Sequence, residues 1–391
     1  MRIRWFCHWG KLTGYGRAAR DYLAALSSIE GVELEIGSLG DAGCKSPEPR
    51  YQYLDKFVVP WDRVKGTVDV EVYHAIPRVL AALEPVTRDR GKRVALTTWE
   101  TSSMPMPLLE PLTKFDAVIT PSEFCCDAIG GAGLVPYSAI RLIPHCFDED
   151  FWPDPVPDER TDRPYRFYSL GAWGERKNTL GLLRAYLHGF SKEDNVSLVL
   201  MIDNANFDEL RSTIARSGLA PAEMPQLVVP DHILEEEELV ALHAESDCFV
   251  TATRGEGFGL GMFEAAIMGR HVIAPLCGGQ SDFLDDYAFA RAVPFQATPC
   301  WGGENRARIE EQDGKRYQVS TVDLPPGINC RQSWADPDLS MLAAQMRALY
   351  DARNNLRTDQ ELADARRAFE ERFGYDAIGP LLAITLREIA K

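Results

Sequence analysis

Short β-branched or aromatic runs alternate with amphipathic stretches along most of the chain, and this rhythm predicts strands and helices in turn. In the first 150 residues the helical pattern is clearest at 17–26, and the strand-like runs are 2–7, 32–38, 68–74, 93–99, 116–122 and 139–145. Alternating strands and helices are typical of a parallel sheet with helices on its faces. The N-terminal part is therefore predicted to be a doubly wound α/β domain.

A proline- and acid-rich segment at 148–164 interrupts this rhythm and has no periodicity of its own. Strand-like runs then return at 165–171, 197–203, 227–231, 248–253 and 271–275, and the chain closes with helical patterns at 336–350, 359–372 and 376–390. We predict a Rossmann-like domain at 1–150, a linker at 151–164, a second Rossmann-like domain at 165–370 and a crossover helix at 371–391. This apolar helix is expected to pack back across the domains.

The charge balance narrows the class of partner. The chain has 42 Lys and Arg against 58 Asp and Glu, a formal net charge of −16, which makes nucleic acid an unlikely partner. Nine cysteines without a C-x2-C pair predict neither a disulfide framework nor a zinc site. No run approaches 18 apolar residues, so we expect a cytoplasmic protein.

The segment TATRGEGFGLGMFEAAIMGRHVIAP, 251–275, predicts a strand, a glycine-rich loop, a helix and a strand. Its glycines let the backbone approach a ligand, and the N-terminus of the following helix attracts an anion such as a diphosphate. Glu256 and Glu264 are spaced so that one carboxylate can reach a sugar and the other a ribose. The alternative interpretation is a tight turn with two solvated glutamates.

EGFGLGMFE (256–264) resembles the E-x7-E signature of retaining glycosyltransferase family 4, which has the GT-B fold. Other segments resemble this family in the same order along nearly the whole chain: 13–26, 121–129, 143–153, 169–186, 278–284 and 334–346. The resemblance implies two doubly wound Rossmann-like domains facing across a cleft, with the acceptor bound by the domain at 1–150 and the nucleotide-sugar donor by the domain at 165–370. It also implies transfer of a hexosyl unit from a UDP- or GDP-sugar to a hydroxyl acceptor, with retention, no metal and no cofactor.

The resemblance implies roles for individual residues. Glu256 would contact hydroxyls of the donor sugar, Glu264 would hold the nucleotide ribose, and Lys177 would bind a phosphate. Gly14 and Gly16 would let a substrate approach the first domain. Backbone N–H groups of the glycine loop would hold the departing diphosphate or the sugar; this loop comprises Gly257, Phe258, Gly259, Leu260 and Gly261.

Two positions depart from the family pattern. Ala172 stands where a basic residue is usual, five positions before Lys177. Arg176 is a substitute for that charge, although neighbouring side chains on one helical turn would point in different directions. Glu100 stands where many members carry a histidine after the fourth strand; it is predicted to orient an acceptor hydroxyl or serve as its base, with a loop or cap carboxylate as the alternative.

Further features have both a functional and a structural interpretation. His74 ends a strand and is expected to point toward the cleft, as a second candidate catalytic group or as a structural histidine. The stretch 77–93 combines an apolar stripe with Arg88, Arg90, Lys92 and Arg93. It would suit peripheral contact with the inner membrane face, although a crossover helix with a solvated turn is favoured. The D-x-D triplets at 148–150 and 336–338 are interpreted as turn and cap residues, and 235–238 as a helix start.

Two other functions remain open at this point. Ala172 and Glu100 would also fit a nucleotide-sugar-binding subunit without turnover. The same fold also hosts nucleotide-sugar epimerases, and an acceptor in the form of a modified nucleobase is a further alternative. The sequence does not choose the base, the sugar, the acceptor or the oligomeric state.

Overall fold

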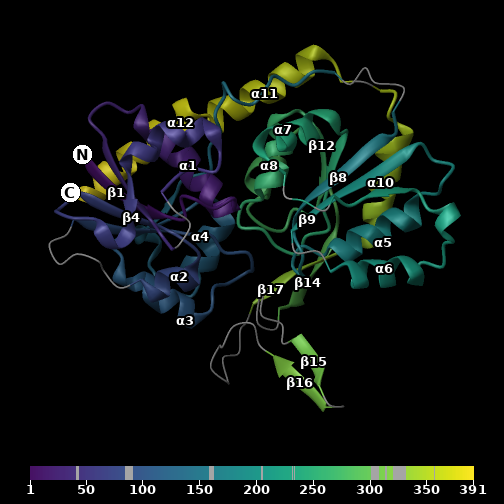
Figure 1. The fold of residues 1–391 in the computed structure, drawn as a ribbon, viewed down its shortest axis with the longest axis horizontal. Coiled ribbons are helices and arrows are strands. Elements are labelled where there is room, and N and C mark those ends of the chain that lie inside the picture. Colours follow the sequence, from purple (N-terminus) through teal and green to yellow (C-terminus); the bar gives the residue numbers. More distant parts are fainter. Residues whose placement is uncertain are drawn as a thin grey trace. The chain divides into compact units, whose positions relative to one another are not determined.

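The computed structural model describes residues 1–40, 44–83, 91–157, 163–203, 206–230, 232, 234–300, 308–312, 315–319, 332–355 and 357–391. The chain divides into two compact units. Unit 1 comprises Met1–Pro153 and Arg367–Lys391, and unit 2 comprises Asp154–Arg366. Residues 158–162 of the predicted linker lie outside the described residues. Each unit is described on its own below (Figure 1).

Unit 1 is built on a parallel sheet of seven strands in the order β3-β2-β1-β4-β5-β6-β7. The strands are β1 (Arg2–Cys7), β2 (Glu33–Ser38), β3 (Val58–Pro60), β4 (Val70–His74), β5 (Lys92–Leu96), β6 (Ala117–Thr120) and β7 (Ile140–Leu142). The order reverses between β1 and β4, which is the ligand-binding switch point of a doubly wound sheet. All six strands predicted for this part are confirmed; β3, only three residues long, was not predicted.

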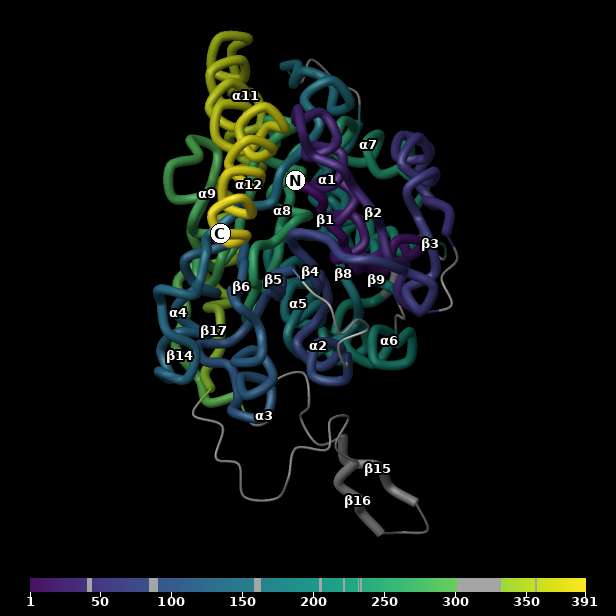
Figure 2. The backbone as a smooth tube through the Cα atoms, turned by 90° about the vertical axis from the view of Figure 1, so that its left-hand side faces the viewer, coloured from purple at the N-terminus to yellow at the C-terminus, as the bar shows by residue number. Residues whose placement is uncertain are grey.

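The helices of unit 1 are α1 (Gly14–Ser27), α2 (Pro77–Ala82), α3 (Met106–Leu109), α4 (Glu123–Gly130) and α12 (Tyr375–Ala390); short 3-10 turns lie at Pro49–Phe57, Trp61–Arg63, Glu110–Lys114 and Tyr137–Ala139. The last helical pattern of the sequence thus forms α12, which lies beside α1 (Figure 2). Its apolar face carries Ile378, Leu382 and Leu386 into the same core as Trp5 and Tyr22. Gly379 allows this close packing, since an added Cβ would lie 2.9 Å from the Ala25 carbonyl oxygen.

Unit 2 has a second parallel sheet, of six strands in the order β10-β9-β8-β11-β12-β13. Its strands are β8 (Tyr165–Ala172), β9 (Val196–Asp203), β10 (Gln226–Val228), β11 (Cys248–Val250), β12 (His271–Ala274) and β13 (Ala290–Ala292). Here the order reverses between β8 and β11, again at a switch point. The two parallel sheets confirm the predicted α/β class.

Helices cover both faces of this second sheet (Figure 1). They are α5 (Thr179–Gly189), α6 (Phe207–Arg216), α7 (Glu236–Glu245), α8 (Leu260–Ile267), α9 (Ser281–Leu284) and α10 (Leu339–Asp351), with a 3-10 turn at Pro221–Glu223. The next helix, α11 (Asp359–Phe373), includes the division between the two units, which falls after Arg366. The acidic run at 235–238 opens α7, as predicted: the Glu235 N–H donates to the Glu238 carboxylate at 2.9 Å. Such a capping box satisfies amides that the helix itself leaves unpaired.

Two antiparallel pairs extend unit 2 beyond its parallel sheet. They are β14 (Phe295–Pro299) with β17 (Ser333–Pro337), and β15 (Arg308–Gln312) with β16 (Lys315–Val319). The helix predicted at 336–350 consequently begins only at Leu339, because residues 333–337 pair with β14. Asp338 caps that helix by accepting the N–H groups of Ser340 and Met341, so its predicted role as a cap residue is confirmed.

Candidate functional site

Three loops of unit 2 meet where adjacent parallel strands end. They follow β8, β11 and β12 and cover 173–178, 251–259 and 275–280. The Arg254 N–H donates to the Arg176 carbonyl at 2.7 Å, and the Gly279 N–H donates to the Glu256 carbonyl at 2.9 Å. The loop after β11 is therefore held on both sides, at the switch point where doubly wound sheets bind ligands.

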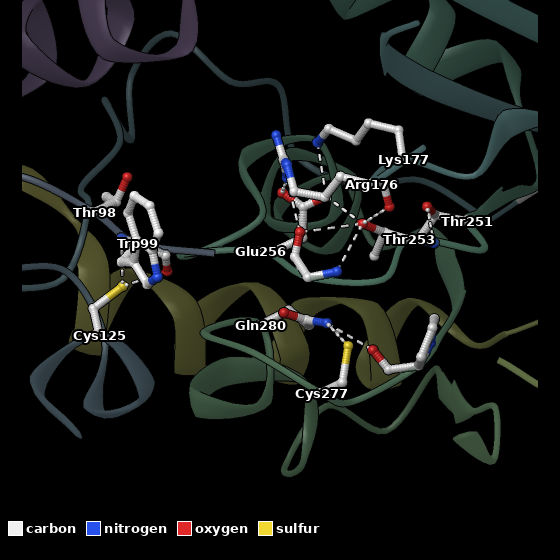
Figure 3. Close-up of polar contacts among 12 residues, drawn as sticks. Thr98, Trp99, Cys125, Arg176, Lys177, Thr251, Thr253, Glu256, Cys277 and Gln280 are labelled. Carbon is white, nitrogen blue, oxygen red and sulfur yellow. Dashed lines mark hydrogen bonds and ion pairs between the residues drawn. The ribbon is translucent and has the colours of Figure 1, made fainter. Parts of the chain in front are cut away.

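The Glu256 carboxylate is the meeting point of this loop cluster (Figure 3). Lys177 Nζ lies 2.7 Å from Oε1, and the Thr253 hydroxyl donates to the same oxygen at 2.8 Å. An Arg176 guanidinium nitrogen lies 3.3 Å from Oε2 and also donates to the Gly255 carbonyl at 2.8 Å. Two cations from the loop after β8 and one hydroxyl from the loop after β11 thus hold one carboxylate.

Arg176 and Lys177 point to the same carboxylate, contrary to the divergence expected for neighbours on one helical turn. The reason lies in the backbone: residues 175–178 form a turn before α5, and Asn178 takes a left-handed conformation with φ of 50°. The Lys177 stem runs beside Gly171, where an added Cβ would be in ordinary van der Waals contact with Lys177 Cδ at 3.4 Å. Arg176 therefore supplies a second charge here, while Ala172 ends β8 and is exposed.

The Glu256 side chain is ionised in spite of its burial. Burial by itself raises the pKa of a carboxyl group, but Lys177, Arg176 and the hydrogen bond from Thr253 outweigh it and hold the pKa of Glu256 below its ordinary value. Its side chain is 9% exposed, whereas Lys177 keeps 25% exposure. The lysine can therefore contact a ligand without leaving the loop cluster.

The N-terminus of α8 follows Glu256 directly. Gly259 precedes the helix with φ of 96°, a conformation that suits glycine, and an added Cβ there would lie 3.9 Å from Glu256 Cβ. Leu260 and Gly261 occupy the first turn, where backbone N–H groups have no carbonyl acceptor within the helix itself. Gly257 is buried, and the Phe258 ring packs against Phe263 and Phe283, which anchors this loop in unit 2.

Glu264 lies on the buried side of α8. Its carboxylate oxygen is 3.4 Å from His243 Nε2, and His243 Nδ1 in turn is 2.7 Å from the Tyr168 hydroxyl. These contacts orient the glutamate through α7 and β8. Its predicted contact with a ribose stays a prediction.

Several residues of this cluster were not predicted as site residues. Thr253 donates to Glu256 from three positions earlier, a spacing that follows from the loop rather than from a recognisable motif. In the loop after β12, Gln280 is fully buried and donates to the Pro275 carbonyl at 2.6 Å and to Cys277 Sγ at 3.7 Å. Burial, and secondarily the Glu256 charge, raises the pKa of the Cys277 thiol to about 12.

Unit 1 presents a separate polar cluster at the end of β5. The Tyr15 hydroxyl lies 2.8 Å from Thr98 Oγ1 and 3.3 Å from Thr97 Oγ1, and it accepts the Thr98 N–H at 3.0 Å. Glu100 is half-buried in the loop that follows; burial first and then its charge raise the pKa of Tyr15. Nearby, the Trp99 N–H donates a hydrogen bond to Cys125 Sγ at 3.3 Å, and the Cys125 thiol donates to the Trp99 carbonyl at 3.2 Å (Figure 3).

His74 ends β4 as predicted but is buried, with 1% exposure. The rings of Trp5, Tyr15 and Tyr22 surround its imidazole at centroid distances of 5.9, 5.6 and 5.9 Å. Neither ring nitrogen has a hydrogen-bond partner among the residues that the structure describes. Burial, followed by the charges of His145 and His8, lowers the pKa of His74 well below 6.5. The imidazole is therefore neutral at physiological pH, and its catalytic role stays a prediction.

The two glycines of the first helix differ in their surroundings. Gly14 begins α1 and is exposed. Gly16 is buried, its N–H donates to the Thr13 hydroxyl at 3.1 Å, and an added Cβ would lie 2.3 Å from the Lys11 carbonyl oxygen. Gly16 thus permits close contact between the helix start and the loop after β1.

The basic stretch 77–93 is only partly within the described residues, since Arg88 and Arg90 lie outside them. Lys92 Nζ is 3.4 Å from an Asp116 carboxylate oxygen, and the Arg93 guanidinium lies over the Phe115 ring at 4.8 Å. Within the described ranges, no helix has both the length and the apolar character needed to cross a membrane. The same part of the chain brings together no group of three His, Cys, Asp or Glu side chains suited to a metal ion.

Comparison with known proteins finds one family match, which lies within unit 2. Residues 165–295 match the family model described as glycosyl transferases group 1. The match includes the three loops around Glu256 and the start of α8. A comparison with curated proteins found no match.

Several solved structures share the fold over nearly the whole chain. Anabaena HepE in complex with UDP and glucose is 15% identical, with 99% of this chain and 100% of HepE covered and a TM-score of 0.66. Sucrose-phosphate synthase from Thermosynechococcus elongatus is 14% identical, with coverage of 100% and 99% and a TM-score of 0.65. A glycosyltransferase from Rickettsia africae is 15% identical, with coverage of 100% and 98% and a TM-score of 0.62. These likenesses confirm the GT-B class of fold.

Proposed function

We propose that the protein is a glycosyltransferase that moves a hexosyl unit from a nucleotide sugar to a hydroxyl acceptor. The observation that carries the proposal is the convergence of Lys177, Arg176 and Glu256 beside the start of α8, in the segment that matches the glycosyl transferases group 1 model. Two cations and first-turn amides suit a diphosphate, and a carboxylate suits sugar hydroxyls.

The donor in this proposal is a UDP- or GDP-hexose bound to unit 2. HepE structures in complex with UDP-glucose and with UDP support the UDP form. Glu264 would accept hydrogen bonds from the ribose, and the family resemblance to the E-x7-E signature supports that assignment. The acceptor would bind to unit 1, where Tyr15, Thr98 and Glu100 gather polar groups at the end of β5.

The proposed reaction breaks the bond between the anomeric carbon and the diphosphate and forms a bond from that carbon to the acceptor oxygen. Negative charge grows on the departing diphosphate, so groups that already point at it stabilise the transition state most. Lys177, Arg176 and the amides of Leu260 and Gly261 supply this stabilisation. We propose that they do so without a metal ion, that configuration is retained, and that the departing phosphate accepts the acceptor's proton.

Donor turnover is the test. The purified protein, with EDTA present, is screened against UDP- and GDP-sugars by thermal shift and by release of free nucleoside diphosphate. We expect one donor to stabilise the protein and to be consumed, because a ligand that binds only the folded state raises its stability. Glu264→Gln should bind that donor more weakly, and Lys177→Met should bind it and release diphosphate far more slowly.

The other outcomes separate the alternatives. Donor binding without release, even with an acceptor panel, would identify a nucleotide-sugar-binding subunit. Release that returns only when Mg²⁺ replaces EDTA would overturn the metal-independent mechanism and keep the transferase. Absence of binding by any nucleotide sugar would overturn the proposed function.

A further inference from the structure

The two cations proposed to bind the donor diphosphate are already paired with a carboxylate in this chain. Lys177 Nζ lies 2.7 Å from Glu256 Oε1, and Arg176 lies 3.3 Å from Oε2. The side chains of these three residues are between 9% and 25% exposed, so the pairs are partly shielded from water. The attraction between the charges of a partly buried ion pair is screened less by water and salt than that of a pair on an open surface.

A diphosphate that binds to the same cations must compete with Glu256. A phosphate oxygen and a carboxylate oxygen occupy the same donor directions of an ammonium group, and two anions at one site repel each other. Arrival of the diphosphate therefore weakens or breaks the ion pairs of Glu256. A carboxylate that stays buried without these partners is costly, so it needs new hydrogen-bond donors.

The sugar of an intact donor can supply those donors, because vicinal hydroxyl groups donate to a carboxylate. Free nucleoside diphosphate cannot, since it brings the competing charge without the hydroxyls that would be held by Glu256. Thr253 stays in place in both cases, because its hydroxyl belongs to the loop that carries Glu256 and donates at 2.8 Å. When the intact donor binds, sugar hydroxyls thus replace the cations that Glu256 loses. When free nucleoside diphosphate binds, no ligand group replaces them.

We infer that Glu256 is a specificity-determining residue that favours the intact nucleotide sugar over free nucleoside diphosphate, by exchanging its Lys177 and Arg176 pairs for sugar hydroxyls. This inference rests on the proposed function and deepens it. The same carboxylate that contacts the donor sugar weakens retention of the spent diphosphate, which promotes product release.

The inference predicts opposite effects of one substitution on two ligands. Glu256→Gln should bind UDP roughly three- to thirtyfold more tightly than the wild type, because Lys177 and Arg176 become available to the diphosphate. The same variant should bind the UDP-sugar equally or more weakly. A glutamate that only contacts the sugar would leave UDP affinity unchanged. Isothermal titration of UDP, the UDP-sugar identified by turnover and inorganic pyrophosphate measures all three affinities.

A matched control separates this exchange from a general effect of charge. Asp336→Asn also removes one negative charge from unit 2, but Asp336 contacts Arg254 at 3.3 Å and its side chain is 56% exposed. It should leave the affinity for UDP within about twofold of the wild type, as expected for a screened surface charge. Glu256→Ala provides a second variant, and thermal unfolding of each protein checks that it folds.

Each result has a defined meaning. Tighter UDP and pyrophosphate binding in both Glu256 variants, with Asp336→Asn unchanged, supports the exchange. Unchanged or weaker UDP binding in folded Glu256 variants overturns the inference while the proposed function stands. Equal tightening in Asp336→Asn also overturns it in favour of net charge. If the wild type binds none of the three ligands, UDP, the UDP-sugar and pyrophosphate, the proposed function is overturned and the inference falls with it.

Discussion

The phenol oxygen of Tyr15 accepts the backbone N–H of Thr98 at 3.0 Å and lies 2.8 Å from Thr98 Oγ1. One side chain thus joins the first turn of α1 to the loop after β5, although 83 positions separate the two residues. In a parallel sheet these two places meet because β4 and β5 lie beside β1 in that order. The link orders the part of unit 1 that we assign to the acceptor.

Tyr15→Phe should weaken acceptor use and leave donor binding intact. The substitution removes the hydroxyl contacts with Thr97 and Thr98 and leaves the part-buried Thr98 N–H without its acceptor, at a cost of about 1–3 kcal/mol in unfolding free energy. We expect a raised KM for the acceptor and an unchanged Kd for the donor, measured by diphosphate release and by calorimetry. Tyr137→Phe is the control: Tyr137 is 55% exposed and its hydroxyl donates to Asp127 at 3.1 Å, so little should change. Equal behaviour of the two variants would contradict the assignment.

Gly278→Ala should disrupt the donor site through the backbone of Glu256. A Cβ at position 278 would lie 2.3 Å from the Glu256 carbonyl oxygen, so the two loops must separate. We expect a loss of about 1–3 kcal/mol in stability and at least tenfold weaker donor binding. Gly174→Ala is a matched control, because its Cβ would meet nothing within 4 Å. If Gly278→Ala binds the donor as the wild type does, the loop contact does not position Glu256.

The ion pairs of Glu256 should make stability fall in acid. The pKa of this carboxyl is held below its ordinary value of 4.5, despite burial, mainly by Lys177 and Arg176. The unfolded chain therefore binds its proton first as the pH falls, and the stability from the ionised form is complete above the unfolded pKa and is lost as the pH falls through the folded one. The difference in unfolding free energy between wild type and Glu256→Gln should shrink in that window. Urea unfolding at a series of pH values measures it; a constant difference would contradict the ion-pair account.

The buried imidazole of His74 should add a second acid sensitivity, in unit 1 and at higher pH. Burial holds the pKa of His74 well below 6.5, so the unfolded chain takes up a proton that the folded chain excludes. Stability from this group is complete above about 6.5 and declines as the pH falls toward the folded value. His74→Phe keeps an aromatic ring among Trp5, Tyr15 and Tyr22 and should reduce this decline.

The same variant also tests the predicted catalytic role of His74. Loss of turnover with unchanged affinity for the donor would support a role for the imidazole at the acceptor. Wild-type turnover in a folded His74→Phe protein would leave the histidine a structural part of unit 1. The acid profile and the rate are independent readouts, so either result is informative.

Local pattern was sufficient for most strands of the two parallel sheets and for the glycine-rich loop before α8. Runs of β-branched and aromatic residues predicted strands such as β1 and β8, because burial on both faces of a parallel sheet favours apolar side chains along the strand. Glycines between Gly255 and Gly261 marked the loop before α8, because backbone freedom is a property of the residue itself. Both signals depend on near neighbours in the chain and can be read without coordinates.

Only the tertiary structure decided which side chains meet. The left-handed turn at Asn178 directs Arg176 and Lys177 to one carboxylate 79 or 80 positions away, an outcome that helical spacing did not predict. The burial of His74 among three aromatic rings and the pairing of Ser333–Pro337 with β14 likewise depend on distant segments. The sequence by itself determined most strands and the glycine-rich loop, because these depend on near neighbours in the chain. The packing of two loops remote in sequence determined that Arg176 and Lys177 pair with Glu256.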